Sequence, residues 1–179
     1  MPDSRHGTDA QPLPPPDLHY WEAAQGWVGL RNAPEAYIEL RRIRPELQSH
    51  PFVRAAWLDA WIAGGDWAQG RAAAEALCRD FPEEPGFWLH LAYATRRVAG
   101  GGGLVAAMVI LESVEQRFPK EWTIPFNLAC YNCQMERLAD AKDCLLRAME
   151  AGGPRIRKMG LEDQDLKPLW PFLTKLGRA

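Results

Sequence analysis

The stretch that decides the fold is residues 51–84, PFVRAAWLDAWIAGGDWAQGRAAAEALCRDFPEE. Its apolar residues recur at intervals of three and four, the spacing of one face of an α-helix, on both sides of Gly64-Gly65-Asp66. Glycine accepts the left-handed backbone that closes a helix, and aspartate accepts hydrogen bonds from the free N–H groups that open the next one. The stretch therefore predicts two helices joined by a tight turn.

The same helical hairpin recurs along the chain. Matching positions in the first helices are Ala23, Trp57, Leu91 and Leu128, which are 34, 34 and 37 residues apart. In the second helices they are Ala36, Gly70, Ala107 and Ala141, which are 34, 37 and 34 residues apart. The excess of three falls where Gly100–Gly103 lengthens a loop. Such a period predicts hairpins that bury their apolar faces against their neighbours.

A 34-residue helix–turn–helix period resembles the tetratricopeptide repeat, and the resemblance covers about residues 18–152. The residues that carry it best are Trp61, Gly65-Asp66-Trp67, Gly70, Ala74, Leu77 and Pro82, with Phe126 to Cys130, Ala141 and Ala148. The resemblance implies an all-α, right-handed α-solenoid of about four hairpins, spanning residues 18–50, 51–84, 85–121 and 122–152. The third repeat departs from the pattern through its glycine insertion, and in the first repeat Pro45 comes three residues early.

Both ends of the chain differ from the repeats. Residues 1–17 are polar and rich in proline, which predicts a disordered N-terminal tail. Residues 153–179 are rich in apolar side chains, and Pro168 and Pro171 exclude one long helix, so we expect a C-terminal cap of one or two short helices over the last repeat. This cap is similar to segments that follow the final repeat in bacterial members of the family, which favours a bacterial source.

Composition narrows the class of protein. The net charge of −2 disfavours general nucleic-acid binding, which needs a basic surface to neutralise phosphates. No run approaches the roughly 18 apolar residues that would span a bilayer, and the first residues lack the apolar core of a secretory signal. The four cysteines all lie in helical patterns, which predicts buried, reduced thiols. We therefore expect a cytoplasmic protein.

The sequence contains no recognisable catalytic or cofactor motif. Gly100–Gly103 is not followed by the Lys-Ser/Thr of a phosphate loop, and the four histidines are scattered. The carboxylates of Glu112, Glu115 and Glu121 fit a solvated helix face. We therefore expect no enzyme activity, no cofactor and no metal.

The tryptophans of the second repeat have a packing role instead. The large side chains of Trp57 and Trp61 should fill the space between helices.

One thiol motif leaves an alternative open. Cys130 and Cys133 lie three residues apart, so a helix places both sulfurs on the same side, and Cys144 of the facing helix could lie near them. A closed zinc site needs a fourth ligand, which the sequence does not offer, and redox motifs of this spacing stand at a helix N-terminus rather than inside a helix. A thiol or metal protein that uses Cys130 and Cys133 is therefore the second alternative.

The resemblance also implies a binding surface. In the family, the first helices of the hairpins line a concave groove that holds an extended peptide or a partner helix. The matching positions here are Trp21, Gln25, Asp59, His90, Tyr93, Arg96, Arg97, Asn127 and Gln134. Arg96 and Arg97 offer guanidinium groups for a carboxylate, and the amide of Asn127 can bond both sides of a peptide group. We expect a protein–protein interaction scaffold or adaptor, and the first alternative is a structural subunit or homodimer of a larger assembly.

Overall fold

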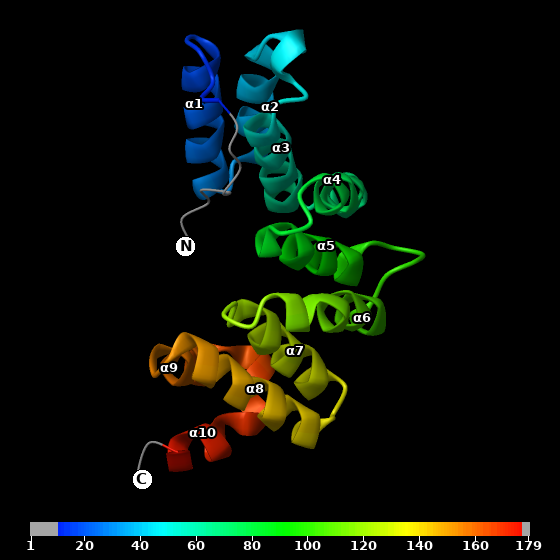
Figure 1. Cartoon of the computed structure of the whole chain (residues 1–179), viewed down its shortest axis with the longest axis vertical. Helices are drawn as coiled ribbons and strands as arrows, with labels where there is room; N and C mark the ends of the chain where they lie inside the picture. Colours follow the sequence, from blue (N-terminus) through cyan, green and yellow to red (C-terminus); the bar gives the residue numbers. More distant parts are fainter. Residues whose placement is uncertain (1–10, 177–179) are drawn as a thin grey trace. The chain divides into compact units, whose positions relative to one another are not determined.

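The computed structural model of the chain describes residues 11–176, and within them every regular element is a helix (Figure 1). The all-α prediction is confirmed. The chain divides into two compact units, Met1–Gly101 and Gly102–Ala179.

Five α-helices build the described part of the first unit, and each after the first packs against the helix before it. They are α1 (Asp17–Gly29), α2 (Ala33–Arg42), α3 (Pro51–Gly64), α4 (Trp67–Asp80) and α5 (Pro85–Arg97), with a short 3-10 turn η1 (Pro45–Leu47) between α2 and α3. Helix α1 also packs against α3, so first helices of successive hairpins meet.

The predicted turn between α3 and α4 is confirmed in its details. Gly65 follows α3 in the left-handed conformation, with φ of 74°. The carboxylate of Asp66 accepts a hydrogen bond from the backbone N–H of Gln69 at 3.3 Å. The local chemistry of these two residues thus ends one helix and begins the next.

Close packing of helices depends on a small residue at position 70. Gly70 is buried in α4, and a β-carbon there would lie 3.1 Å from Ile62 Cδ1 and 3.9 Å from Ala94 Cβ. Residues of α3 and α5 therefore both approach this point of α4. The missing side chain at position 70 therefore leaves room for Ile62 of α3 and Ala94 of α5.

The two tryptophans of α3 are partly buried, and Trp57 packs in the space between α3 and Tyr37 of α2 at the margin of the core. Trp57 and Trp61 are half-buried, with ring centroids 5.2 Å apart, and Trp57 also stacks on Tyr37 at 5.9 Å. The indole N–H of Trp57 donates to Gln48 Oε1 at 2.9 Å. Because this stack keeps an edge in solvent, the interior is left to smaller side chains such as Leu58.

The described part of the predicted disordered tail is packed against the first unit, which corrects that prediction for residues 11–17. Leu13 is 3% exposed and joins the core cluster of α1, α2 and α3. Asp17, the first residue of α1, is buried and accepts hydrogen bonds from the backbone N–H and Nε of Arg44, both at 2.8 Å. Burial by itself raises the pKa of Asp17, but the hydrogen bonds and charge of Arg44 outweigh it and hold that pKa below its usual value. Residues 1–10 of the predicted tail lie outside the described residues.

The second unit consists of a helical hairpin with flanking helices. Its elements are α6 (Leu104–Val114), η2 (Glu115–Arg117), α7 (Thr123–Gln134), α8 (Leu138–Gly152), α9 (Arg155–Glu162), η3 (Gln164–Leu169) and α10 (Trp170–Leu176). Helices α7 and α8 pack along each other, α6 packs on α7, and α9 and η3 pack on α8.

The segment after α8 folds back over the last hairpin. It buries Ile156, Leu166, Leu169 and Leu173. Gly160 allows this packing, since a β-carbon there would lie 2.9 Å from Leu173 Cδ1, and its carbonyl accepts from the indole N–H of Trp170 at 3.0 Å. The proline-rich cap sequence therefore forms three short helical pieces instead of one helix.

The third expected repeat, residues 85–121, is divided between the two units. Its first helix α5 packs against α4 in the first unit, while α6 packs against α7 in the second. The loop between them contains Gly100 and Gly103, both with positive φ. This is the loop that carries the insertion relative to the repeat period.

Within residues 11–176, none of the helices combines the length and the hydrophobicity needed to cross a bilayer.

Candidate functional site

A groove of about 630 Å3 opens in the first unit between α1, α3 and α5, at the turn that leads into α4. It is lined by Gln25, Val28, Gly29, Arg31, Asp59, Ile62, Ala63, Gly64, Gly65, Trp67, His90 and Tyr93. Four of the nine predicted binding residues are therefore brought together: Gln25 from α1, Asp59 from α3, and His90 and Tyr93 from α5. The volume is within the range of sites that hold small molecules or short peptide segments.

Two ionisable side chains face each other in this groove. Asp59 Oδ1 lies 3.6 Å from His90 Nε2, which is too long for a hydrogen bond, and the side chains are 13% and 31% exposed respectively. His90 Nδ1 is buried without a hydrogen-bond partner among the described residues. Burial lowers the pKa of His90 to about 4, although the backbone of Gly86 partly opposes the shift. The imidazole is therefore neutral at pH 7 and can donate or accept one hydrogen bond to a ligand.

An aromatic pair forms another part of the groove lining. The rings of Trp67 and Tyr93 meet edge to face, with centroids 5.8 Å apart. The guanidinium of Arg97 lies 3.5 Å from the centroid of Tyr93 and 5.3 Å from that of Trp67, and its Nη1 donates to the Tyr93 carbonyl at 3.1 Å. Arg97 thus packs against both aromatic rings, and its role in binding a carboxylate stays a prediction.

Two other predicted residues lie outside the groove lining. The indole N–H of Trp21 donates to the carbonyl of Phe52 at 3.1 Å, and the two rings pack with centroids 6.0 Å apart. Trp21 therefore joins α1 to α3 and does not line this groove, and its role in partner binding stays a prediction. Arg96 is half-buried on α5 and is also not among the residues that line the groove.

The remaining two predicted residues belong to the second unit. The amide of Asn127 donates to the carbonyl of Thr123 at 2.8 Å, one turn earlier on α7. Gln134 is half-buried at the last residue of the same helix. Their prediction as part of one binding surface with the groove of the first unit stays a prediction.

Sequence reasoning missed some of the groove residues. Trp67 lies directly after the Gly-Asp turn, and Arg31 lies in the turn after α1 with φ of 57°. Both belong to turns between helices, while the family pattern points to positions along the first helices. The only feature of the sequence that could have marked Trp67 as a groove residue is that a large aromatic side chain stands directly after the Gly-Asp turn.

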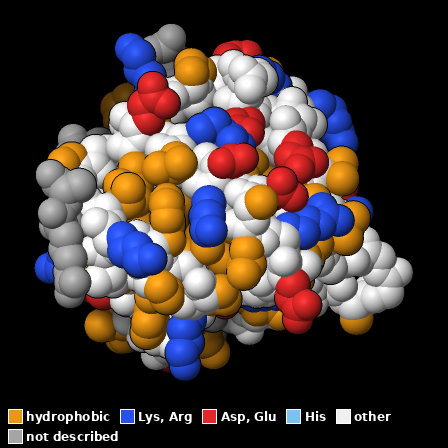
Figure 2. Space-filling model, turned by 90° about the horizontal axis from the view of Figure 1, so that it is seen from below, with side chains coloured by type: hydrophobic (Ala, Val, Ile, Leu, Met, Phe, Trp, Pro, Cys, Tyr) orange, Lys and Arg blue, Asp and Glu red, His pale blue; other side chains and the backbone are white. Residues whose placement is uncertain are grey.

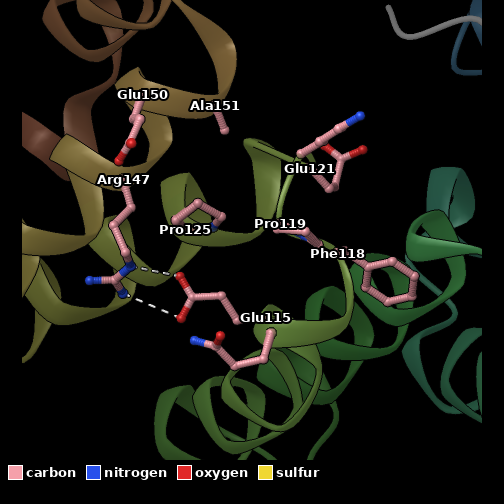
Figure 3. A pocket seen from close by; sticks show the side chains of 10 residues that line it. Glu115, Phe118, Pro119, Glu121, Pro125, Arg147, Glu150 and Ala151 are labelled. Atoms are coloured by element: carbon pink, nitrogen blue, oxygen red, sulfur yellow. Dashed lines mark hydrogen bonds and ion pairs between the residues drawn. The ribbon is translucent and has the colours of Figure 1, made fainter.

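The second unit contains a cavity of about 510 Å3 where the α6–α7 connection meets α8 (Figure 3). It is lined by Glu115, Gln116, Phe118, Pro119, Lys120, Glu121, Pro125, Arg147, Glu150 and Ala151. The Arg147 guanidinium holds both carboxylate oxygens of Glu115, with Nε and Nη2 at 2.9 and 3.3 Å. Glu121 accepts from the backbone N–H of Thr123 at 3.1 Å. Glu115 and Glu121 are therefore structural contacts, which corrects their interpretation as a solvated row.

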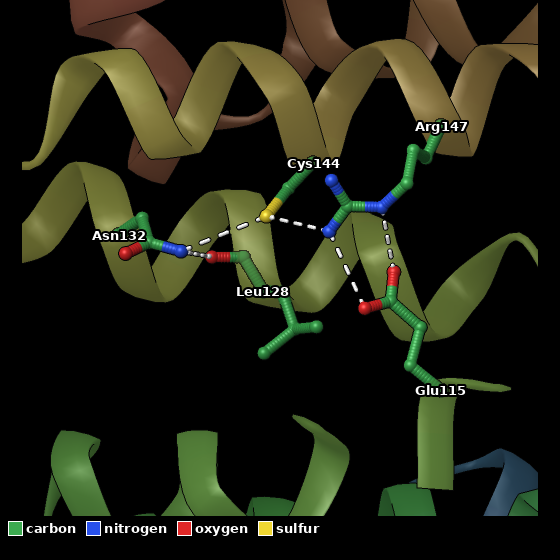
Figure 4. A network of polar contacts seen from close by, with 5 residues as sticks. All are labelled: Glu115, Leu128, Asn132, Cys144 and Arg147. Atoms are coloured by element: carbon green, nitrogen blue, oxygen red, sulfur yellow. Dashed lines mark hydrogen bonds and ion pairs between the residues drawn. The ribbon is translucent and has the colours of Figure 1, made fainter. Parts of the chain in front are cut away.

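The thiol of Cys144 extends this polar network inside the second unit (Figure 4). Its Sγ lies 3.4 Å from Arg147 Nη2 and 3.7 Å from Asn132 Nδ2. Burial raises the pKa of Cys144 even though the charge of Arg147 opposes the shift. The group is thus a protonated thiol at neutral pH and a packing residue of the α7–α8 interface.

Cys133 is not part of the group that could hold a metal ion among residues 11–176. Cys130 lies instead near two aspartates of the cap, with Sγ 3.9 Å from Asp163 Oδ2, and the ligand atoms of Cys130, Asp163 and Asp165 lie within 4.8 Å of one another. Burial, followed by the charges of Asp165 and Asp163, raises the pKa of Cys133 to about 11. A thiol of that pKa is a poor nucleophile at neutral pH, which disfavours a reactive C-x-x-C motif.

Comparison with known structures supports the helical-repeat interpretation. The solved structure "MamA MSR-1 C2" matches the chain with a TM-score of 0.59 at 16% sequence identity, over 90% of this chain and 97% of that one. MamA contains tetratricopeptide repeats. The fold is that of a helical repeat. Neither a family model nor a curated protein matches the chain, so the likeness describes the fold.

Proposed function

We propose that the protein is a non-catalytic, cytoplasmic binding scaffold that holds a short segment of a partner protein in the groove between α1, α3 and α5. The observation that carries the proposal is that Gln25, Asp59 and Tyr93, from three different helices, line one groove. In helical-repeat folds the hairpins pack on their neighbours through some of their faces and leave another face open, and that open face forms the binding surface.

The chemistry of the groove indicates what such a segment would contain. Val28, Ile62 and the exposed edge of the Trp67–Tyr93 pair offer apolar contact for one aliphatic or aromatic side chain. The amide of Gln25 can hydrogen-bond a peptide backbone, which an extended segment exposes along its length. We therefore expect an extended peptide with a single apolar anchor.

Selection from a peptide library tests this proposal. Peptides enriched on the wild-type protein should bind the Tyr93→Glu variant at least about tenfold more weakly, because the carboxylate replaces one ring of the aromatic pair. Val109→Glu provides the matched control, since Val109 is 56% exposed on α6 and does not line the groove. Equal binding to the wild-type and Tyr93→Glu proteins, or enrichment of no peptide, would reject the groove as the binding site.

Two alternatives make different predictions. A structural subunit or homo-oligomer would show a mass above that of the monomer in light scattering, without any peptide present. A metal protein would bind zinc through Cys130 together with Asp163 and Asp165, and Cys130→Ser would abolish that binding.

A further inference from the structure

A buried thiol and two carboxylates meet where the cap, residues 153–176, packs against α7. Cys130 of α7 is 5% exposed, Asp163 joins α9 to η3, and Asp165 lies in the first turn of η3. The Sγ of Cys130 and one carboxylate oxygen from each aspartate lie within 4.8 Å of one another. Thiolate sulfur and carboxylate oxygen are both ligands of zinc. The three atoms are therefore a candidate ligand set that joins two separate elements.

The turn between α9 and η3 directs Asp163 toward the thiol. Its Oδ1 accepts a hydrogen bond from the backbone N–H of Asp165 at 2.8 Å, and its Oδ2 lies 3.9 Å from Cys130 Sγ. Leu166, the next residue after Asp165, is fully buried and holds η3 on the α7–α8 hairpin. One oxygen of Asp163 thus maintains the turn, while the other faces Cys130.

The separations are close to those that a zinc ion imposes on its ligands. Bonds of about 2.3 Å to sulfur and about 2.0–2.2 Å to oxygen place neighbouring ligands of a tetrahedral zinc roughly 3.5 Å apart. The 3.9 Å between Cys130 Sγ and Asp163 Oδ2 exceeds this value by about 0.4 Å. The 4.8 Å limit for the whole set exceeds it by about 1.3 Å. Rotation of the half-buried Asp165 side chain covers such a distance without a backbone shift.

The charge of Asp163 favours a cation at this place. Its side chain is half-buried, and within residues 11–176 no lysine or arginine forms an ion pair with it. In the view from the side at which Figure 1 draws α10, several exposed Asp and Glu side chains lie beside Lys or Arg side chains (Figure 2). A metal ion would give Asp163 the positive partner that no side chain supplies.

The thiol selects the kind of metal. Calcium and magnesium take six or more ligands, nearly all of them oxygen, whereas zinc accepts sulfur and oxygen in tetrahedral sets of four. We propose that Cys130, Asp163 and Asp165 bind one zinc ion that ties the cap to α7. When the sulfur bonds the metal, the thiol releases its proton to the solvent, and a water molecule fills the fourth position.

This inference goes beyond the proposed function and does not replace it. The three ligands lie beyond residue 101, whereas the groove residues lie between positions 25 and 93. The zinc ion stabilises the second unit, and a peptide selected on the groove should bind equally well with and without zinc. Failure of either proposal leaves the other in place.

Titration of the reduced, metal-free full chain with zinc and with cobalt(II) tests the site. One equivalent of zinc should bind in calorimetry and, at saturation, raise the melting temperature by at least about 3 °C. Cobalt(II) should produce the charge-transfer absorption of a metal–thiolate bond, because only a coordinated sulfur gives rise to it.

Variants identify the ligands. Cys130→Ser should abolish the cobalt absorption, whereas Cys133→Ser, one turn along the same helix, should keep it. Asp163→Asn retains an oxygen for the backbone N–H of Asp165, and it should weaken zinc binding at least about tenfold. The matched control Asp143→Asn changes an exposed carboxylate of α8 outside the ligand set and should bind zinc as the wild type does.

Failure of zinc to bind at one equivalent overturns the proposal. Cobalt absorption that survives in Cys130→Ser overturns it too, as does absorption that is lost in a Cys133→Ser variant with unchanged circular dichroism, because the cysteine pair would then hold the metal. Unchanged zinc affinity in Asp163→Asn also contradicts it. Since Asp163→Asn should melt like the zinc-free wild type, weaker binding by this variant reports the lost ligand and not a lost fold.

Discussion

Replacing Gly70 by alanine probes how closely the helices of the first unit approach each other. In an open helix position this change stabilises by about 0.5–1 kcal/mol, because alanine loses less backbone entropy on folding. Here the added β-carbon would lie 3.1 Å from Ile62 Cδ1, so the isoleucine must move by a few tenths of an ångström. We expect the gain to be cancelled, which leaves a net change within about 0.5 kcal/mol.

A double-mutant cycle with Ile62→Val isolates the contact. Valine lacks the δ-carbon that the new methyl group meets, and Ile→Val by itself costs about 0.5–1.5 kcal/mol in a packed site. In the Gly70→Ala background the same change should cost less by about 0.5–1 kcal/mol, since it also relieves the crowding. Urea unfolding followed by circular dichroism measures all four proteins.

Additive free energies of unfolding would contradict this reasoning, because they would mean that residues 62 and 70 do not touch. The same cycle has a functional readout, since Ile62 lines the groove and Gly70 does not. Gly70→Ala should reduce the free energy of binding of a groove-selected peptide by more than it changes the free energy of unfolding. Adding Ile62→Val to the Gly70→Ala variant should restore part of that binding.

Three further predictions address burial and charge. Arg44→Ala should cost about 2–4 kcal/mol in urea unfolding, because it leaves the buried Asp17 carboxylate with a backbone partner only; a cost under about 0.5 kcal/mol would be inconsistent with that pair. Gly152→Ala places a β-carbon 2.6 Å from a neighbouring side chain and should destabilise by about 1–3 kcal/mol, whereas Gly29→Ala, with open space around it, should not; equal melts would refute this. His90 has a folded-state pKa of about 4 against 6.5 for the free side chain, so the stability from its neutral form is present above pH 6.5 and is lost as the pH falls from about 6.5 to about 4. His90→Gln should flatten the decline in urea midpoint over that interval, and an unchanged slope would exclude His90 as its source.

Features governed by local chemistry could be predicted from the sequence. The turn at Gly65 and Asp66 could be predicted because it depends on local preferences. Glycine readily adopts the left-handed backbone, and the aspartate carboxylate accepts a hydrogen bond from an N–H three residues later. The groove positions of Gln25, Asp59 and Tyr93 followed from the family register along the first helices.

Features that depend on distant partners could not be predicted in this way. Asp17 was predicted to belong to a disordered polar tail. Its carboxylate is instead buried against Arg44, which lies 27 residues away and is not indicated as a partner by the local sequence. Trp57 matched a core position in the helical pattern, whereas its contacts with Tyr37 and Gln48 draw it to the surface of the unit.

The most direct test of the central claim is a nuclear magnetic resonance titration of the protein with a library-selected peptide. The account predicts that the perturbed signals belong to Gln25 of α1, Asp59 of α3 and Tyr93 of α5 together. Perturbations confined to a single one of these helices, or found only beyond residue 101, would contradict it.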